Sequence, residues 1–293
     1  MGPAAGTSLC AHVLVRHDHL IIGQPAHAWV SGQLARAWGN AAFPAPEPRE
    51  PVCLAAEQHD VGWADADLAP LLGRDGRPRS FRDYPRPEHV AIWAGAARRL
   101  LAQSRYAALL ASLHGTSLYE RIDPDAHPPE VAGAIRAYLA GQRALQAELG
   151  TGLDPAAVDR NRRLILTLDG LSLALCHDRA ATLDGAPAAA GPATLRVEPD
   201  PPAASARDDR AAPAGIAAGR DGQAVPAVRD DRAVPPGAAT LRVAIDPWPF
   251  AATRVVVGCE ARRLAGSFTD EAALHAALAA APWVPLRWEL SPG

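Results

Sequence analysis

The sequence of 293 residues contains no lysine: all 29 of its basic residues are arginine, so no lysine is available to bind a phosphate group. Its four cysteines lie far apart and form no Cys-x-x-Cys pair. They are Cys10, Cys53, Cys176 and Cys259, and three of the four fall in apolar runs, which favours buried free thiols over disulfide bonds. The formal net charge of −3 gives no indication of a nucleic acid polymer as partner.

Several longer patterns are also missing. No apolar run approaches the length of a membrane span, and the N-terminus lacks the basic and apolar segments of a signal peptide. We therefore expect a cytoplasmic protein that does not bind membranes. The Gly-x-Ser-x-Gly turn of a Ser-His-Asp hydrolase is absent. No glycine-rich loop follows a predicted strand, which argues against a P-loop or a Rossmann nucleotide site.

The first two thirds of the chain carry apolar residues at helical spacing. Hydrophobic residues make up 48% of the sequence, which is ample for a core. We predict helices that begin at Gln24, in the segment before His59, at Pro87, near Ser104, at Pro128 and after Asp154. Asp154-Pro155 is a favourable N-cap and first-turn pair for the last of these helices.

The chain divides into three predicted regions. Residues 1–182 form a helical metal-binding domain with an N-terminal β-hairpin. Residues 183–239 are rich in Ala, Pro, Gly, Arg and Asp, and we expect a disordered insertion there. Residues 240–293 contain strands at 241–245, 254–257 and 286–290 and a helix at 270–281. The expected fold class is mainly α, a helical bundle with a small antiparallel β-sheet formed by the N- and C-terminal segments.

Metal-ligand side chains recur on the apolar stripes of the predicted helices. They are His27, His59, Asp60, His89, His114 and Asp169. Asp169 is the only charged residue within the apolar run 164–176, where an unpaired carboxylate would cost several kcal/mol. A bundle that turns these stripes inward brings four imidazoles and two carboxylates together. The simpler alternative is a set of core histidines satisfied by hydrogen bonds.

The chemistry of this set points to a transition metal. Nitrogen and carboxylate ligands without a thiolate suit Fe, Mn, Zn or Co better than a structural zinc site. Six ligands suffice for one ion or for two bridged by Asp60, and they leave room for water or a small-molecule substrate. His59 and Asp60, which are adjacent at a predicted helix end, are the candidate catalytic residues.

The order His, His-Asp, His, His, Asp on successive helices resembles the HD-domain superfamily of metal-dependent phosphohydrolases. Residues 55–62, Ala-Ala-Glu-Gln-His-Asp-Val-Gly, are similar to its central motif, and the likeness covers residues of about 20–180. It implies that His27, His59, Asp60 and Asp169 hold a first metal, and that His89 and His114 complete a second with Asp60 bridging. The whole chain also resembles an uncharacterised bacterial family with His-Asp-x-Gly-Trp and Ser-Leu-His-Gly segments.

The resemblance implies hydrolysis of a phosphate mono- or diester, such as a nucleotide, at a mono- or dinuclear metal site. Two alternatives share the same ligands: an HD-type diiron oxygenase, and a non-catalytic protein that binds a metal or another ligand. The sequence departs from the family at Trp63, where a lysine is common. The phosphate would then be bound by an arginine, and the candidates are Arg16, Arg36, Arg98, Arg99 and Arg105.

Overall fold

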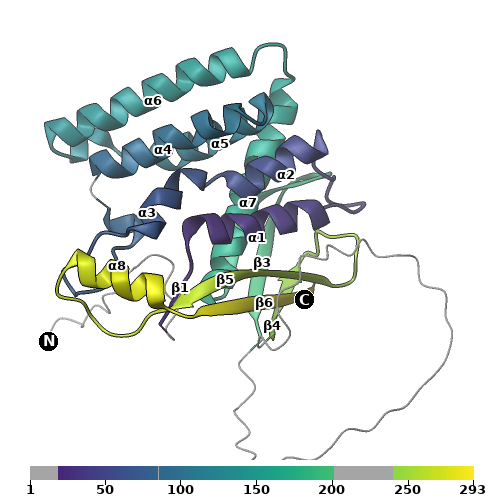
Figure 1. Ribbon diagram of the computed structural model, residues 1–293. Helices are drawn as coiled ribbons and strands as arrows, with labels where there is room; N and C mark the ends of the chain where they lie inside the picture. The colour runs from purple at the N-terminus through teal and green to yellow at the C-terminus, as the bar shows by residue number, and fades with distance from the viewer. Residues whose placement is uncertain (1–18, 85, 201–239) are drawn as a thin grey trace, which may run out of the picture.

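The computed structural model describes residues 19–84, 86–200 and 240–293 (Figure 1). Their helices are α1 (Gln24–Ala37), α2 (Arg49–Gln58), α3 (Ala64–Leu68), α4 (Arg86–Leu101), α5 (Arg105–Tyr119), α6 (Pro129–Leu149), α7 (Pro155–His177) and α8 (Glu271–Ala280), with short 3-10 turns η1 (Val61–Trp63), η2 (Phe81–Asp83) and η3 (Pro124–Ala126). Their strands are β1 (Leu20–Ile21), β2 (Ala181–Ala188), β3 (Gly191–Pro199), β4 (Thr240–Asp246), β5 (Val255–Arg263) and β6 (Trp283–Pro292).

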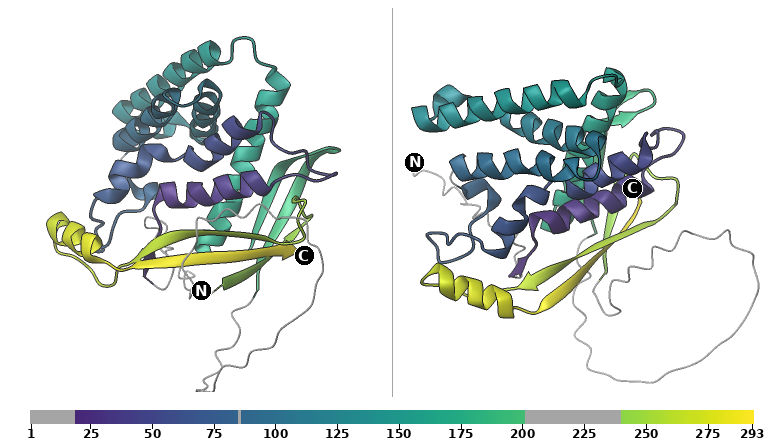
Figure 2. Two further views of the ribbon diagram at one scale, coloured as in Figure 1. Left: turned by 45° about the vertical axis from the view of Figure 1, so that its right-hand side comes forward. Right: turned by 45° about the horizontal axis from the view of Figure 1, so that its top comes forward.

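The strands form one curled sheet with the order β1-β5-β6-β4-β3-β2. All neighbouring strands in it are antiparallel except β4 and β6, which run parallel with Leu241 opposite Trp288. The α1–α7 layer lies on one side of this sheet, with α6 farthest from it (Figures 1 and 2). Helix α1 packs on β5 and α7 packs on β2 and β3. Helices and sheet therefore share one core, which includes the fully buried Leu34, Leu168 and Trp288.

Each predicted helix is present. The N-cap at Asp154 is confirmed, because its carboxylate oxygens accept hydrogen bonds from the backbone N–H groups of Ala156 at 3.1 Å and Ala157 at 3.3 Å. The C-terminal strands and helix are present as β4, β5, α8 and β6. Cys53, Cys176 and Cys259 are buried and form no disulfide bond among the described residues, as predicted for three of the cysteines. None of the helices in the described ranges combines the length and the apolar composition that a membrane span requires.

The predicted fold class, a mainly α bundle with a small antiparallel sheet from the two ends of the chain, is wrong in its β part. The sheet has six strands within the described residues, and its β4–β6 pair is parallel. Two of its strands, β2 and β3, lie in residues 181–199, most of which belong to the predicted disordered insertion. These strands hold because Ala186, Leu195 and Val197 are fully buried in the shared core, although large apolar residues are few there.

Two other expectations fall on parts of the chain that the structure does not describe. The predicted N-terminal hairpin lies largely within residues 1–18, outside the described residues. Its second strand is represented by β1, which pairs antiparallel with β5. Residues 201–239, the remainder of the predicted insertion, also lie outside the described residues.

Candidate metal centre

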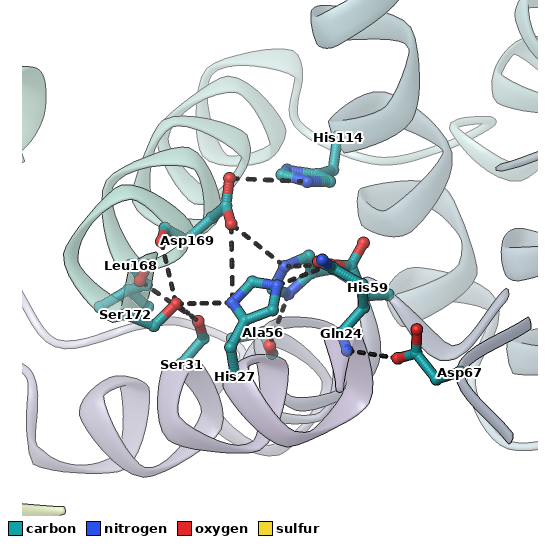
Figure 3. Close-up of polar contacts among 11 residues, drawn as sticks. Gln24, His27, Ser31, Ala56, His59, Asp67, His114, Leu168, Asp169 and Ser172 are labelled. Carbon is teal, nitrogen blue, oxygen red and sulfur yellow. Dashed lines mark hydrogen bonds and ion pairs between the residues drawn. The ribbon is translucent and has the colours of Figure 1, made fainter. Parts of the chain in front are cut away.

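Four helices bring the candidate ligands to one buried place. His27 lies on α1, His59 is the C-cap of α2 and Asp60 follows it, while His114 lies on α5 and Asp169 on α7. Figure 3 shows the side chains of His27, His59, His114 and Asp169 pointing toward one another. All three imidazoles are at most 1% exposed.

A glycine fixes the turn that follows the His-Asp pair. Gly62 lies in η1, which packs directly against α4. A Cβ atom at this position would overlap the backbone carbonyl oxygen of Ile92 and lie 3.3 Å from the Cβ of Ala96. A glycine therefore allows the close approach of η1 to α4, and this approach sets the direction in which the chain leaves His59 and Asp60.

The ligand atoms form two overlapping groups, His27 with His59 and Asp60, and His59 with His114 and Asp169. His27 Nε2 lies 2.7 Å from Asp60 Oδ2, and His59 Nε2 lies 3.5 Å from Asp169 Oδ1 and 3.7 Å from Asp60 Oδ2. His114 Nε2 lies 3.9 Å from Asp169 Oδ2. Ligands about 2.0–2.2 Å from one ion are separated by roughly 3 to 3.5 Å, so the donors fit a shared metal after small shifts.

The protonation of His59 favours coordination through Nε2. Its Nδ1 lies 2.8 Å from the carbonyl oxygen of Ala56, which only accepts hydrogen bonds, so Nδ1 carries a proton and Nε2 is the nitrogen left to bind a metal. Within the described residues His59 Nε2, Asp60 Oδ1 and His114 Nδ1 are buried without a hydrogen-bond partner. Buried polar atoms of this kind are rare, and an ion would satisfy the first two. A histidine held through a backbone carbonyl is also a common arrangement in metal sites.

Two serines hold His27 from the opposite side. Ser172 Oγ donates to the carbonyl oxygen of Asp169 at 2.9 Å, and Ser31 Oγ contacts Ser172 Oγ at 3.0 Å. His27 Nδ1 lies 2.9 Å from Ser172 Oγ and is its donor, because the Ser172 hydrogen is already used. His27 Nε2 then faces the carboxylate of Asp60, with 2.7 Å between Nε2 and Oδ2.

The charges in the cluster are strongly coupled. Burial alone would lower the pKa of His59, but the carboxylates of Asp60 and Asp169 outweigh burial and raise that pKa to about 9. Burial would raise the pKa of Asp169, yet the contact with His59 at 3.5 Å and the neighbouring imidazoles lower that pKa far below its ordinary value. Burial, followed by the charge of His59, lowers the pKa of His114 to about 4. The cluster without metal thus holds a proton on His59, and Asp169 is ionised.

The structure brings together five of the six predicted ligands and leaves His89 outside both groups. The Nδ1 atom of His89 contacts the hydroxyl of Tyr119, and its ring packs 5.2 Å from the ring of Trp63. Burial and then the charge of Arg86 lower the pKa of His89 to about 4. A second ion would therefore lack one of the ligands that the family resemblance implied for it.

A pocket of about 590 Å³ opens beside Asp169. Helix α7 provides one wall, the end of α5 and the residues after it a second, and β2 a third. Its basic lining residues are Arg121, Arg162 and Arg163. None of the arginines named from the sequence lines it, and Arg16 lies outside the described residues. Arg36 instead pairs with Glu57 at 2.5 Å, and Arg99 pairs with Asp65 at 2.7 Å.

Sequence reasoning missed the serines and the pocket arginines, although their spacing was informative. Ser31 lies four residues after His27, and Ser172 lies three residues after Asp169, so each shares a helix face with a ligand. Arg162 lies seven residues before Asp169, which is also close to two full helical turns.

The fold and this cluster define an α+β protein with a buried histidine and aspartate centre suited to a metal ion. Residues 13–266 match the family described as "Protein of unknown function (DUF3891)", and the chain belongs to that family. No curated protein and no solved structure matches the chain.

Proposed function

We propose that the protein is an HD-type phosphohydrolase that binds one divalent transition metal, Fe, Mn, Zn or Co, and hydrolyses a phosphate ester of a small molecule. The ligands in this proposal are His27, His59, Asp60 and Asp169, with His114 beside them. The cytoplasmic location expected from the sequence belongs to the same proposal.

The observation that carries the proposal is the Nε2 atom of His59, which has no hydrogen-bond partner among the described residues. This atom is completely buried and faces the carboxylates of Asp60 and Asp169 at 3.7 and 3.5 Å. A cluster of satisfied core histidines would leave no such atom, because an unpaired buried polar atom costs about 1–3 kcal/mol. The resemblance of the His-Asp-x-Gly segment to the HD superfamily supports the same ligands.

The residues of the chain have distinct tasks in this reaction. A bound ion would supply Lewis-acid activation of water and of a phosphate oxygen. Ala56 and Ser172 orient the imidazoles of His59 and His27, and this fixes the directions of the lone pairs. Asp169 has a side chain that is 14% exposed and lines the adjoining pocket, so it lies where substrate would approach.

The position of His89 favours hydrolysis over the diiron oxygenase alternative. Two iron ions need a second complete ligand set, and His89 is instead in contact with Tyr119. A hydrolase works with a single ion, for which the remaining donors suffice.

Metal analysis and turnover together test the proposal. Protein purified without added metal should contain about one equivalent of transition metal and should hydrolyse p-nitrophenyl phosphate or bis(p-nitrophenyl) phosphate after loading with Mn²⁺, Co²⁺, Zn²⁺ or Fe²⁺. Asp60→Ala should abolish both metal retention and turnover. The matched control is His275→Ala, because His275 hydrogen-bonds the Pro70 carbonyl at 2.9 Å and belongs to neither ligand group.

Three outcomes would count against the proposal. Wild-type protein with no affinity for metal would favour a non-catalytic role. Two iron equivalents with consumption of O₂ would favour the oxygenase. Equal metal content in wild type and Asp60→Ala would place the metal elsewhere.

A further inference from the structure

We propose that the pocket beside Asp169 binds a small molecule with two anionic groups about 9 to 10 Å apart. One group would lie at the candidate metal centre, and the other would be bound by Arg163 and Arg121. The first half of this inference rests on the proposed function, whereas the second half rests on the arginines alone.

The spacing follows from the geometry of α7. Arg162 and Arg163 precede Asp169 by seven and six residues, which places them about 10.5 and about 9 Å from it along the helix axis. Side-chain reach does not close this gap, since Arg162 Nη2 and Arg163 Nε are both bound to Asp159, at 2.7 and 2.8 Å, in the direction away from Asp169. A single phosphate bound by either of these α7 arginines is therefore too small to reach a metal held by Asp169 as well.

The arginines differ in their availability for a ligand. Arg162 is occupied, because besides Asp159 it donates from Nη1 to Ser117 Oγ at 3.1 Å. Arg163 is bound to Asp159 only through Nε, at 2.8 Å, which orients the guanidinium and leaves its two terminal nitrogens unpaired within the described residues. Arg121 is exposed and has no hydrogen bond or ion pair to any described residue. Arg163 and Arg121 therefore offer several charge-assisted donors to an anion.

The rest of the pocket limits the ligand. Its volume of about 590 Å³ is within the usual range for small-molecule sites, about 300–1,000 Å³. The β2 wall carries the carboxylate of Asp184, which accepts a hydrogen bond from Thr194 Oγ1 at 2.7 Å. This negative charge disfavours an anion on the β2 side, so the second anionic group is placed on the α7 side. A terminal phosphate and a terminal carboxylate both meet these requirements.

Two probes of equal chain length test the inference. Hexamethylene bisphosphonate has an anionic group at each end, about 9 Å apart when extended, and hexylphosphonate has only one. Calorimetry on the full chain, loaded with one equivalent of Zn²⁺, should give at least about tenfold tighter binding of the two-headed probe. Arg163→Gln and Arg121→Gln should each remove most of this preference. Arg160→Gln is the matched control on the same helix, because Arg160 does not line the pocket.

The variants also separate this inference from the proposed function. Protein that retains Zn²⁺ but binds both probes equally, or loses the preference equally in Arg160→Gln, would overturn the inference and leave the metal site intact. Protein that retains no Zn²⁺ would overturn the proposed function and the two-group ligand with it. In that case the anion site at Arg163 and Arg121 would stand only if metal-free protein bound hexylphosphonate more weakly after Arg163→Gln.

Discussion

Metal binding should expel about one proton per ion from His59 at neutral pH. In the metal-free protein the pKa of His59 is about 9, because burial is outweighed by the carboxylates of Asp60 and Asp169. The metal needs the Nε2 atom that holds this proton. The dissociation constant of the metal should therefore fall about tenfold for each unit of pH between about pH 6.5 and about pH 9.

Calorimetric titration in buffers with different ionisation enthalpies measures the released protons directly. At about pH 7.5 a histidine with a pKa of about 9 releases nearly one proton, whereas one with its ordinary pKa of about 6.5 releases about a tenth. His114 should release none, because burial and the charge of His59 lower its pKa to about 4. A measured release near a tenth of a proton, with metal bound, would refute the assigned charge state of His59. Asp169→Asn should reduce the release, since one of the two carboxylates that raise this pKa is lost.

The same group gives the metal-free protein a stability that depends on pH. The pKa of His59 is raised on folding, so its stabilising contribution is complete below about pH 6.5 and is lost as the pH rises through about 9. The shift from the ordinary value corresponds to about 3 kcal/mol. Urea unfolding of chelator-treated protein at several pH values should follow this decline, and added metal should reverse it. A metal-free protein that gains stability between these two pH values would contradict the reasoning.

Three further changes have effects of known direction. Gly62→Ala should lower the free energy of unfolding, measured by urea titration, by about 1–3 kcal/mol, because its Cβ would overlap the Ile92 carbonyl. The control Gly95→Ala should not destabilise the protein, because there is open space at its Cβ. Ser172→Ala should weaken metal binding about 10- to 100-fold in equilibrium dialysis, because His27 Nδ1 loses its partner; unchanged affinity would refute the orienting role. Burial raises the pKa of Asp67 to about 7, so the wild type loses stability as the pH rises from about 4 through about 7. Asp67→Asn should therefore melt at a higher temperature than the wild type above about pH 7 and at nearly the same temperature below about pH 4.

The helical part of the fold was accessible from the sequence because its signals are local. Apolar residues at helical spacing and the Asp154-Pro155 start locate α7, and the structure confirms both. The sheet was harder to predict, because strand pairing joins segments far apart in the chain. The composition of residues 183–199 predicted disorder and was misleading, whereas the alternation in Thr194-Leu195-Arg196-Val197 indicated the strand that is present. The similar segment at 240–243 begins the strand beside it in the sheet.

The candidate site was predictable to the extent that helical stripes face the core. His27, His59 and Asp169 each lie on such a stripe, and the structure brings them together. His89 also lies on such a stripe, but it is not the residue of α4 that packs against His114. That residue is Trp93, one turn further along, whose ring lies 5.5 Å from the ring of His114. Sequence spacing identifies which face of a helix is buried. Which helical turn on that face contacts the neighbouring helices depends on how far the helices are displaced along their axes, and spacing does not give this displacement.

The pairing of β3 with β4 makes the connection between them replaceable. These strands are antiparallel neighbours, with Glu198 opposite Ala244 and the backbone N–H of Asp200 bonded to the carbonyl of Arg242 at 2.9 Å. Residues 201–239 thus join two chain ends that the sheet already holds side by side, as a short hairpin turn would. Exchanging these 39 residues for a four-residue turn would reduce the entropy of loop closure by about 2 kcal/mol. The same position offers a place to insert a reporter domain without interrupting any helix that carries a ligand.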